Sequence, residues 1–159
     1  MTSATSKGRR AAFTAKGAMV GEVAEHPNVE RFRGLYKAFS EGDVDAVREA
    51  LADDLVWHVP GRHRFSGDRS KADTMALFEE VVPEFSEAGT PVISTFNIEI
   101  EGIHASDEWV FMRVHWDHTR DGKRFDQHGV EVFRLNPEGR ISEFWALMRD
   151  TAAFDEFFS

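Results

Sequence analysis

The dipeptide Asp121-Gly122, set between two long β-prone segments, constrains the fold of this chain more than any other feature. Asp-Gly favours the two-residue type I′ turn of a β-hairpin, because both central residues of that turn need positive φ angles. The flanking segments 109–119 and 125–135 are rich in Val, Phe, Trp and His, as strands are. We therefore expect an antiparallel hairpin whose register places Met112 opposite Glu131.

This register also decides which side chains share a face, because side chains alternate along a strand. One face of the hairpin is mostly apolar, and the same parity carried across the turn at 136–139 extends it onto the segment 141–148, provided that no bulge intervenes. The members of this face are Met112, Val114, Trp116, His118, Phe125, Gln127, Gly129, Glu131, Phe133, Phe144, Ala146 and Met148.

Glu131 is the one carboxylate on this apolar face. A carboxyl group surrounded by Met, Trp and Phe loses hydration, which raises its pKa and favours a protonated group that donates a hydrogen bond. The alternative is a glutamate that pairs with an arginine or lines a wet cavity, since structural ion pairs perturb pKa values as well.

The chain before the hairpin predicts three helices. Phe32, Leu35, Tyr36 and Phe39 have amphipathic helical spacing, and Gly42 can end that helix. Asp43 caps a second helix with Leu51 inward, and a third runs from Ser70 to Gly89. Strands are expected at 55–59, 92–101, 109–119, 125–135 and 141–148, with a short helix at the end of the chain. Helices followed by an antiparallel meander indicate an α+β domain.

The length of 159 residues fits one domain, which we expect at 28–159. Residues 1–27 are rich in Ala, Ser, Thr, Gly and basic residues and lack sustained apolar periodicity, so they predict a disordered arm. They also lack the apolar core of a signal peptide.

Composition excludes several classes of function. The formal net charge is −9 and the arm is basic, so the domain is strongly acidic and would repel a nucleic acid. No apolar run is long enough to span a membrane. The absence of cysteine excludes disulfides, thiolate metal sites and cysteine nucleophiles, and it is compatible with a reducing compartment. We expect a cytoplasmic protein with no nucleic-acid or membrane partner.

Several segments, by their order and spacing, resemble the nuclear transport factor 2-like superfamily, in its ketosteroid isomerase and SnoaL-like polyketide cyclase branch. The matching segments are Glu41-Gly42-Asp43-Val44-Asp45-Ala46, Ala52-Asp53-Asp54, Trp57-His58-Val59-Pro60-Gly61, Ser66-Gly67 and Arg134-Leu135-Asn136-Pro137-Glu138-Gly139-Arg140-Ile141. The resemblance implies a curved, mixed but mainly antiparallel sheet that forms a cone, with three N-terminal helices closing an apolar pocket. It also implies a homodimer through the outer face of the sheet.

The resemblance implies a pair of catalytic residues. The base of ketosteroid isomerases falls on His58, counted back from Ser66-Gly67, and their protonated aspartate falls on or beside Glu131. Their first-helix tyrosine falls on Leu35, one step from Tyr36, which removes one oxyanion donor and argues against steroid isomerisation. SnoaL-like cyclases use a histidine and an acid, which suits His58 and Glu131 better. A histidine that only fixes the Pro-Gly loop is the alternative for His58.

We therefore expect an enzyme that binds a small hydrophobic carbonyl compound and performs isomerase- or cyclase-type acid/base chemistry without cofactor or metal. The expected substrate-binding residues are Trp57, Met112, Trp116, His118, Phe133, Phe144 and Met148. The alternative is a non-catalytic ligand-binding or dimerisation domain of the same fold.

Two further interpretations are ranked lower. Limonene-type epoxide hydrolases need an Asp-Arg-Asp set. Arg113 matches their arginine, but His115 stands at the position of one acid, and Ala146 stands near the position of the other. On the face opposite Glu131, His115 faces His128 and Asp117 faces Asp126. This set could hold a zinc-like ion, but a dimer interface or a solvated face is the simpler interpretation.

Overall fold

The computed structural model describes residues 25–64, 66–86, 95–120 and 122–159, without the side chains of 80–86, 95 and 96. The elements follow in the order α1 (Pro27–Ser40), α2 (Val44–Ala50), β1 (Leu51–Val59), β2 (Gly67–Arg69), α3 (Lys71–Ser86), β3 (Thr95–Ala105), β4 (Trp109–Arg120), β5 (Lys123–Leu135), β6 (Ile141–Met148) and α4 (Thr151–Phe157). Most of the expected arm, the expected helix end at Gly89, residues 92–94 and Asp121 lie outside the described residues.

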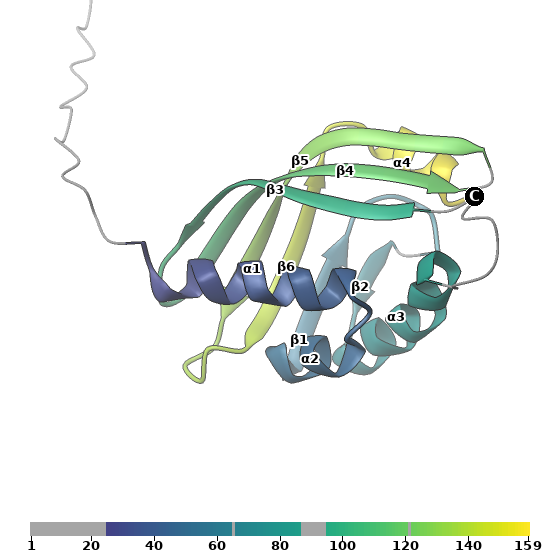
Figure 1. Ribbon diagram of the computed structural model, residues 1–159. Helices are drawn as coiled ribbons and strands as arrows, with labels where there is room; N and C mark the ends of the chain where they lie inside the picture. Colours follow the sequence, from purple (N-terminus) through teal and green to yellow (C-terminus); the bar gives the residue numbers. More distant parts are fainter. Residues whose placement is uncertain (1–24, 65, 87–94, 121) are drawn as a thin grey trace, which may run out of the picture.

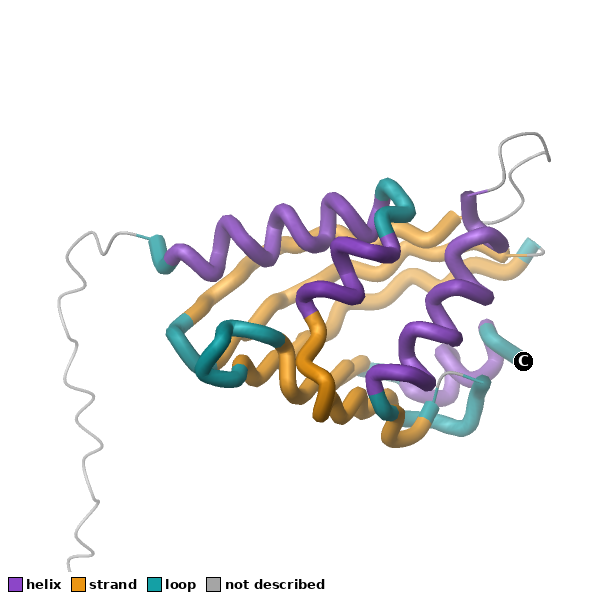
Figure 2. The backbone as a smooth tube through the Cα atoms, turned by 90° about the horizontal axis from the view of Figure 1, so that it is seen from below, coloured by secondary structure: helices purple, strands orange, loops and turns teal. Residues whose placement is uncertain are grey.

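The strands form one open sheet in the order β2-β1-β6-β5-β4-β3. Only the β1–β6 pair is parallel among these neighbours, so the sheet is mixed, as expected. The sheet curves around α1, and α2 and α3 lie beyond α1 on the same concave side (Figure 1). Seen from below, all three helices cross in front of the strands (Figure 2). The predicted α+β architecture is confirmed.

The predicted register of the hairpin is confirmed. Met112 pairs with Glu131 and Arg120 with Lys123, and Gly122 has a φ of 77°. In the β5–β6 ladder Phe133 pairs with Phe144 and Glu131 with Ala146. A register shift lies between Arg134 and Leu135, beyond these pairs. Residues 144, 146 and 148 therefore still point to the same face of the sheet as Glu131, as predicted.

The structure differs from expectation around β1. This strand begins at Leu51, directly after α2, because Leu51 already has an extended backbone (φ −90°, ψ 135°). A register shift between Leu51 and Val56 interrupts the alternation, and Asp53 and Asp54 are exposed there. Residues 51–54 therefore have no strand-like sequence pattern. The three-residue strand β2 was not predicted, since it is too short for alternation to be seen.

Two predicted helix boundaries are confirmed. Gly42, with a φ of 78°, follows the C-cap of α1, and the side chain of Asp43 accepts a hydrogen bond from the backbone N–H of Ala46 at the start of α2. His26 caps α1 through its Nδ1. None of the helices in the described ranges is long and apolar enough to cross a lipid bilayer.

The core lies between the concave face of the sheet and the helices. Most of its strand residues are inward members of β4, β5 and β6, and β1 adds Leu51 and Leu55. Its largest fully buried apolar side chains are Phe32, Phe133, Leu51, Met112, Ile141, Val110 and Val114. Since one face of every central strand is buried here, a slip by one residue would expose the whole set, which stabilises this register.

Candidate functional site

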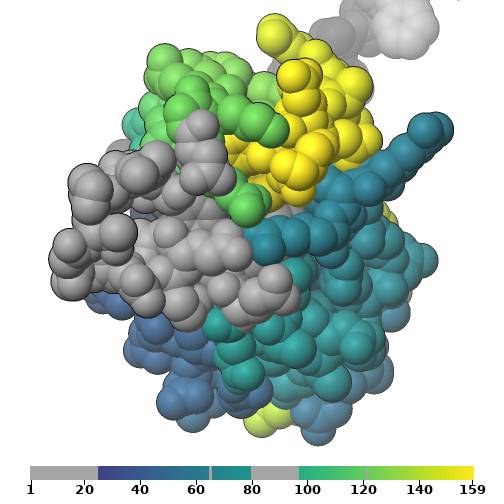
Figure 3. Space-filling view, turned by 90° about the vertical axis from the view of Figure 1, so that its right-hand side faces the viewer, coloured from purple at the N-terminus to yellow at the C-terminus, as the bar shows by residue number. Residues whose placement is uncertain are grey.

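An apolar cavity of about 150 Å³ lies inside the cone, between the sheet and the helices. It is lined by Leu35, Tyr36, Phe39, Val47, Leu51, Trp57, Val59, Leu77, Phe78, Ile98, Trp116, His118, Glu131, Phe133, Ile141, Phe144, Ala146, Met148, Phe154 and Phe158. Helix α4 lies at the wide end of the cone, between the β4–β5 hairpin and the β1–β2 region (Figure 3). Among the described lining residues Glu131 is the sole acid, so any proton chemistry in this pocket centres on it.

Glu131 is 4% exposed and holds two hydrogen bonds inside the pocket. The Tyr36 hydroxyl donates to its Oε2, and the Trp116 indole donates from Nε1 to its Oε1 over 3.2 Å. Burial raises the pKa of Glu131 to about 8, because the charged form loses its hydration. With this pKa the group is mostly a protonated acid at neutral pH, which is the first of the two alternatives that the sequence left open.

Gly129 allows Trp116 to reach this carboxyl group. A Cβ atom at position 129 would lie 2.3 Å from the Trp116 ring and 2.6 Å from the Leu147 carbonyl oxygen. The six-membered ring of the indole therefore lies against Gly129, while its N–H donates to Glu131. No larger residue fits at position 129 without displacing this donor.

Tyr36 is a pocket residue that the counting from the family motif missed. That count fell on Leu35 and predicted the loss of a donor, whereas the structure brings the Tyr36 hydroxyl to Glu131. The amphipathic spacing contained the signal, since Tyr36 lies one helical turn from Phe32, which is 1% exposed. Residues one turn apart share a face, so the helical pattern was a better guide than the gapless count.

His118 also lines the pocket, in an uncharged form. It is 1% exposed, and burial lowers its pKa to about 4. Its Nδ1 accepts a hydrogen bond from the backbone N–H of Asn97 (3.2 Å), so the ring proton of the neutral form lies on Nε2. A ring with these properties is a poor proton acceptor at neutral pH.

The expected position of His58 needs correction. Its Nδ1 lies 2.7 Å from Asp68 Oδ1 on β2, and its ring stacks on Trp145 at 5.2 Å, on the convex side of the sheet. Trp57 enters the pocket instead, with its ring stacked on Phe144 at 3.7 Å. Adjacent strand residues point to opposite faces, so Trp57 and His58 cannot both line the cavity. The structure therefore does not bring His58 and Glu131 together.

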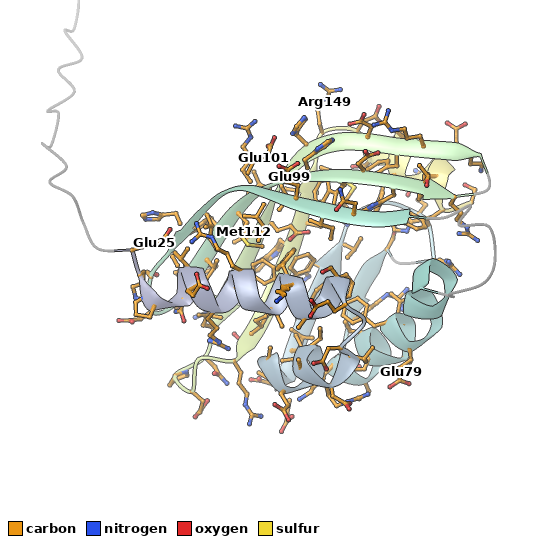
Figure 4. The ribbon with its side chains drawn as sticks, in the orientation of Figure 1. Glu25, Glu79, Glu99, Glu101, Met112 and Arg149 are labelled. Carbon is orange, nitrogen blue, oxygen red and sulfur yellow. The ribbon has the colours of Figure 1, made fainter. Side chains whose placement is uncertain are left out.

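The other expected binding residues are placed as follows. Lining side chains come from β1, β4, β5 and β6, and they include Trp57, Trp116, His118, Phe133, Phe144 and Met148. Met112 is fully buried opposite Glu131 but does not line the cavity. In Figure 4 Met112 lies between the sheet and α1, whereas Glu99 and Glu101 project from the convex side.

The convex face carries the second set of histidines. His115 and His128 stack at 4.4 Å, His115 Nε2 lies 2.8 Å from Asp126 Oδ1, and His128 Nδ1 lies 3.0 Å from Glu101 Oε2. Across the described ranges no group of three or more ligands is arranged to hold a metal. Arg113 also pairs with Glu101 there (2.9 Å), so the arginine that matched limonene-type epoxide hydrolases lies outside the pocket.

A wider groove of about 880 Å³ lies on the surface near the β5–β6 turn. Its charged wall residues include Asp54, Asp107, Glu108 and Glu138, which are exposed. These carboxylates are hydrated and carry no structural sign of proton chemistry. The smaller cavity around Glu131 is therefore the better candidate for a functional site.

Comparison with known proteins places this geometry in context. Residues 32–144 match the family model of the SnoaL-like domain. An uncharacterized protein of Mycobacterium tuberculosis is 24% identical over an alignment of 142 residues, which covers 86% of this chain and all of that protein. The solved structure of Bal32a, from a soil-derived mobile gene cassette, has a TM-score of 0.68 at 28% identity and covers 83% of this chain and 96% of its own.

Two more distant structures share the fold. IdmH, a candidate polyketide cyclase of Streptomyces antibioticus, has a TM-score of 0.58 at 22% identity, covering 81% of this chain and 96% of its own. An epoxide hydrolase of M. tuberculosis, of the limonene epoxide hydrolase-like kind, has a TM-score of 0.57 at 20% identity, covering 81% and 85%. At such identities the likeness concerns the cone-shaped fold alone.

Proposed function

This chain belongs to the SnoaL-like domain family, and from that premise we propose that it binds a small apolar carbonyl compound and polarises the carbonyl oxygen through Glu131. The chemistry is of the isomerase or cyclase type: a base from solution removes the proton on the carbon beside the carbonyl group, and the carboxyl group of Glu131 stabilises the resulting enolate oxygen by donating a hydrogen bond. Glu131 acts as the proton donor, and the aromatic wall excludes water. The reaction needs no cofactor in this scheme.

One observation carries the proposal, namely that both hydrogen bonds at Glu131 are donated to the carboxyl oxygens. Neither of them uses the carboxyl proton. Because the pKa of Glu131 is about 8, that proton is present at neutral pH and can be donated to an acceptor in the cavity. A carbonyl oxygen is such an acceptor, and it binds the donor more strongly as negative charge develops on it.

The surroundings of Glu131 support a carbonyl ligand that is otherwise apolar. Ala146, directly opposite Glu131, contributes only a methyl group, so space beside the carboxyl stays open. Phe133 and Phe144, whose ring centroids lie 4.9 Å apart, also line the pocket. In a dry site of this kind a directed donor stabilises a developing oxyanion far more than it would in water. IdmH, which shares the fold, is a candidate polyketide cyclase.

A non-catalytic binding domain is the second candidate, and the state of the histidines favours it. His118, with a pKa of about 4 and its Nδ1 engaged by Asn97, is poorly suited to abstract a proton. His58 lies on the other face of the sheet. A pocket that donates a proton but removes none would hold a carbonyl compound without converting it.

Hydrogen–deuterium exchange at the methyl group of acetophenone distinguishes the two candidates. If the protein promotes enolate formation, deuterium from D₂O enters the acetyl methyl group faster with protein than with buffer alone, as followed by NMR. Glu131→Gln should lower the protein-dependent rate by up to about 100-fold, because the amide N–H that replaces the carboxyl O–H is a weaker donor to a developing oxyanion. Tyr36→Phe should lower it less, because the carboxyl group itself remains.

Glu99→Gln is the matched control, since Glu99 lies on the convex face and is exposed. It should leave the exchange rate unchanged. Wild-type exchange that Glu131→Gln does not slow would contradict the enzymatic proposal. Binding of acetophenone without exchange would instead establish the non-catalytic candidate.

We also propose a homodimer through the convex face. Its support is an apolar patch of three large exposed side chains on adjacent strands: Phe111 is 45% exposed, Val130 38% and Leu147 55%. Exposed apolar clusters of this kind commonly mark protein interfaces. Leu147→Asp should convert the dimer to a monomer in sedimentation velocity, whereas the same substitution is not expected to disturb the pocket. A wild-type protein that sediments as a monomer at all concentrations would contradict this interface.

A further inference from the structure

The size of the cavity and the rings around it point to a definite ligand class. We propose that the pocket accepts a carbonyl compound with a single ring and excludes fused polycyclic compounds, and that Trp57 sets this limit. The inference rests on the proposed role of Glu131 and names the substrates that this role serves.

The volume of the cavity limits the size of its ligand. The cavity has a volume of about 150 Å³. Apolar cavities of about this size hold one benzene-sized molecule. Pockets for larger ligands usually measure about 300 Å³ or more. A ligand with two or more fused rings would have to displace packed side chains, which a close-packed interior resists.

An aromatic wall lines one side of the pocket and consists of Phe144, Trp57, Phe78 and Phe39. Trp57 lies on Phe144 with centroids 3.7 Å apart and meets the edge of Phe78 at 5.5 Å. Phe78 meets Phe39 of α1 at 5.4 Å. These contacts form one continuous line of rings from β6 to α1. Each ring supports the next, so the wall cannot yield at one residue without losing contacts at another.

The distribution of polar groups in the pocket also restricts the ligand. The hydrogen-bonding atoms of Tyr36, Trp116 and Glu131 gather at one place in the pocket. The aromatic wall supplies apolar ring faces. A ligand that contacts both the hydrogen-bonding groups and the aromatic wall has one carbonyl oxygen attached to one flat apolar ring. Such a ring has the shape that stacks on an aromatic side chain.

Trp57 is the specificity-determining member of this wall. It is the largest ring in the line, and it comes from β1, whereas the Glu131 carboxyl group comes from β5. Trp57→Ala would therefore enlarge the cavity without touching the proton donor. Trp109 offers a matched control, because it stacks on Trp145 and Phe111 and does not line the pocket.

The test uses three aryl methyl ketones with one, two and three fused rings: acetophenone, 1-acetonaphthone and 9-acetylanthracene. Binding is measured by calorimetry at pH 6.5, where Glu131 is protonated. Wild-type protein should bind acetophenone about tenfold or more tightly than 1-acetonaphthone and show no binding of 9-acetylanthracene. Trp57→Ala should reverse the preference for the first two, and Trp109→Ala should leave it unchanged. The milder Trp57→Phe should shift it in the same direction by less.

The outcomes separate this inference from the proposed function. Wild-type protein that binds the two- or three-ring ketone as tightly as acetophenone, with Glu131→Gln weakening both, overturns the size limit alone. A retained ring preference that Glu131→Gln does not affect overturns the role of Glu131 alone. Failure of all three ketones to bind wild-type protein contradicts both. An unchanged preference in folded Trp57→Ala and Trp57→Phe overturns the role of Trp57.

Discussion

The wild-type protein should lose stability as the pH rises from about 6.5 to about 8, and the Glu131→Gln variant should not show this loss. Burial raises the pKa of Glu131 from 4.5 to about 8 in the folded state. The folded protein therefore binds the carboxyl proton more tightly than the unfolded chain does. Its contribution to stability is complete below pH 4.5 and is lost as the pH rises through 8. The full contribution is about 5 kcal/mol at most.

His118 contributes with the opposite sign. Its pKa falls from 6.5 to about 4 on folding, so its stabilising effect is present above pH 6.5 and is lost as the pH falls through 4. The two slopes oppose each other between pH 4.5 and 6.5, where the wild-type stability should change little. Above pH 6.5 only the Glu131 slope remains, and stability falls.

Urea unfolding at a series of pH values measures this difference. The free energy of unfolding of the wild type relative to Glu131→Gln should decrease steadily from pH 4.5 to about 8. Glu99→Gln, on the exposed convex face, should keep the wild-type profile. A constant difference between wild type and Glu131→Gln would mean that the carboxyl group is ionised in the folded protein throughout, and the proton-donor role would be wrong.

Gly129→Ala should destabilise the protein by about 3 kcal/mol, a large effect for adding one methyl group. The new Cβ would meet the Trp116 ring at 2.3 Å and the Leu147 carbonyl oxygen at 2.6 Å. The backbone oxygen cannot move aside as the tip of a side chain can. Both β5 and the indole must therefore shift, and the hydrogen bond from Trp116 to Glu131 should be lost.

Gly34→Ala is the matched control for this substitution. A Cβ atom at Gly34, inside α1, meets nothing within 4 Å. Alanine there should stabilise the protein by about 0.5–1 kcal/mol, because glycine is unfavourable inside a helix. Trp116→Ala combined with Gly129→Ala should destabilise less than the sum of the two changes, since the ring that collides is gone. Thermal or urea unfolding of a Gly129→Ala variant as stable as the wild type would show that the indole does not lie over this glycine.

The hairpin illustrates how far the sequence alone reaches. The Asp-Gly turn and the period-two alternation are local properties, and they correctly placed Glu131 on the buried face opposite Met112. The same alternation, applied to Trp57 and His58, would have shown that only one of them can enter the pocket. Counting residues from a family motif placed His58 inward and passed over Tyr36, because such a count ignores which face a side chain occupies.

The amino-acid sequence determined the register of β4 and β5, and with it the burial of one acid among apolar side chains, since turn geometry and alternation depend on adjacent residues alone. The tertiary structure decided what meets that acid. Tyr36 reaches it from α1 across the cone, 95 residues away in the chain. Trp57 closes the cavity from β1, beyond a register shift that interrupts its alternation. These contacts depend on how helices pack across a curved sheet, and no local pattern encodes that packing.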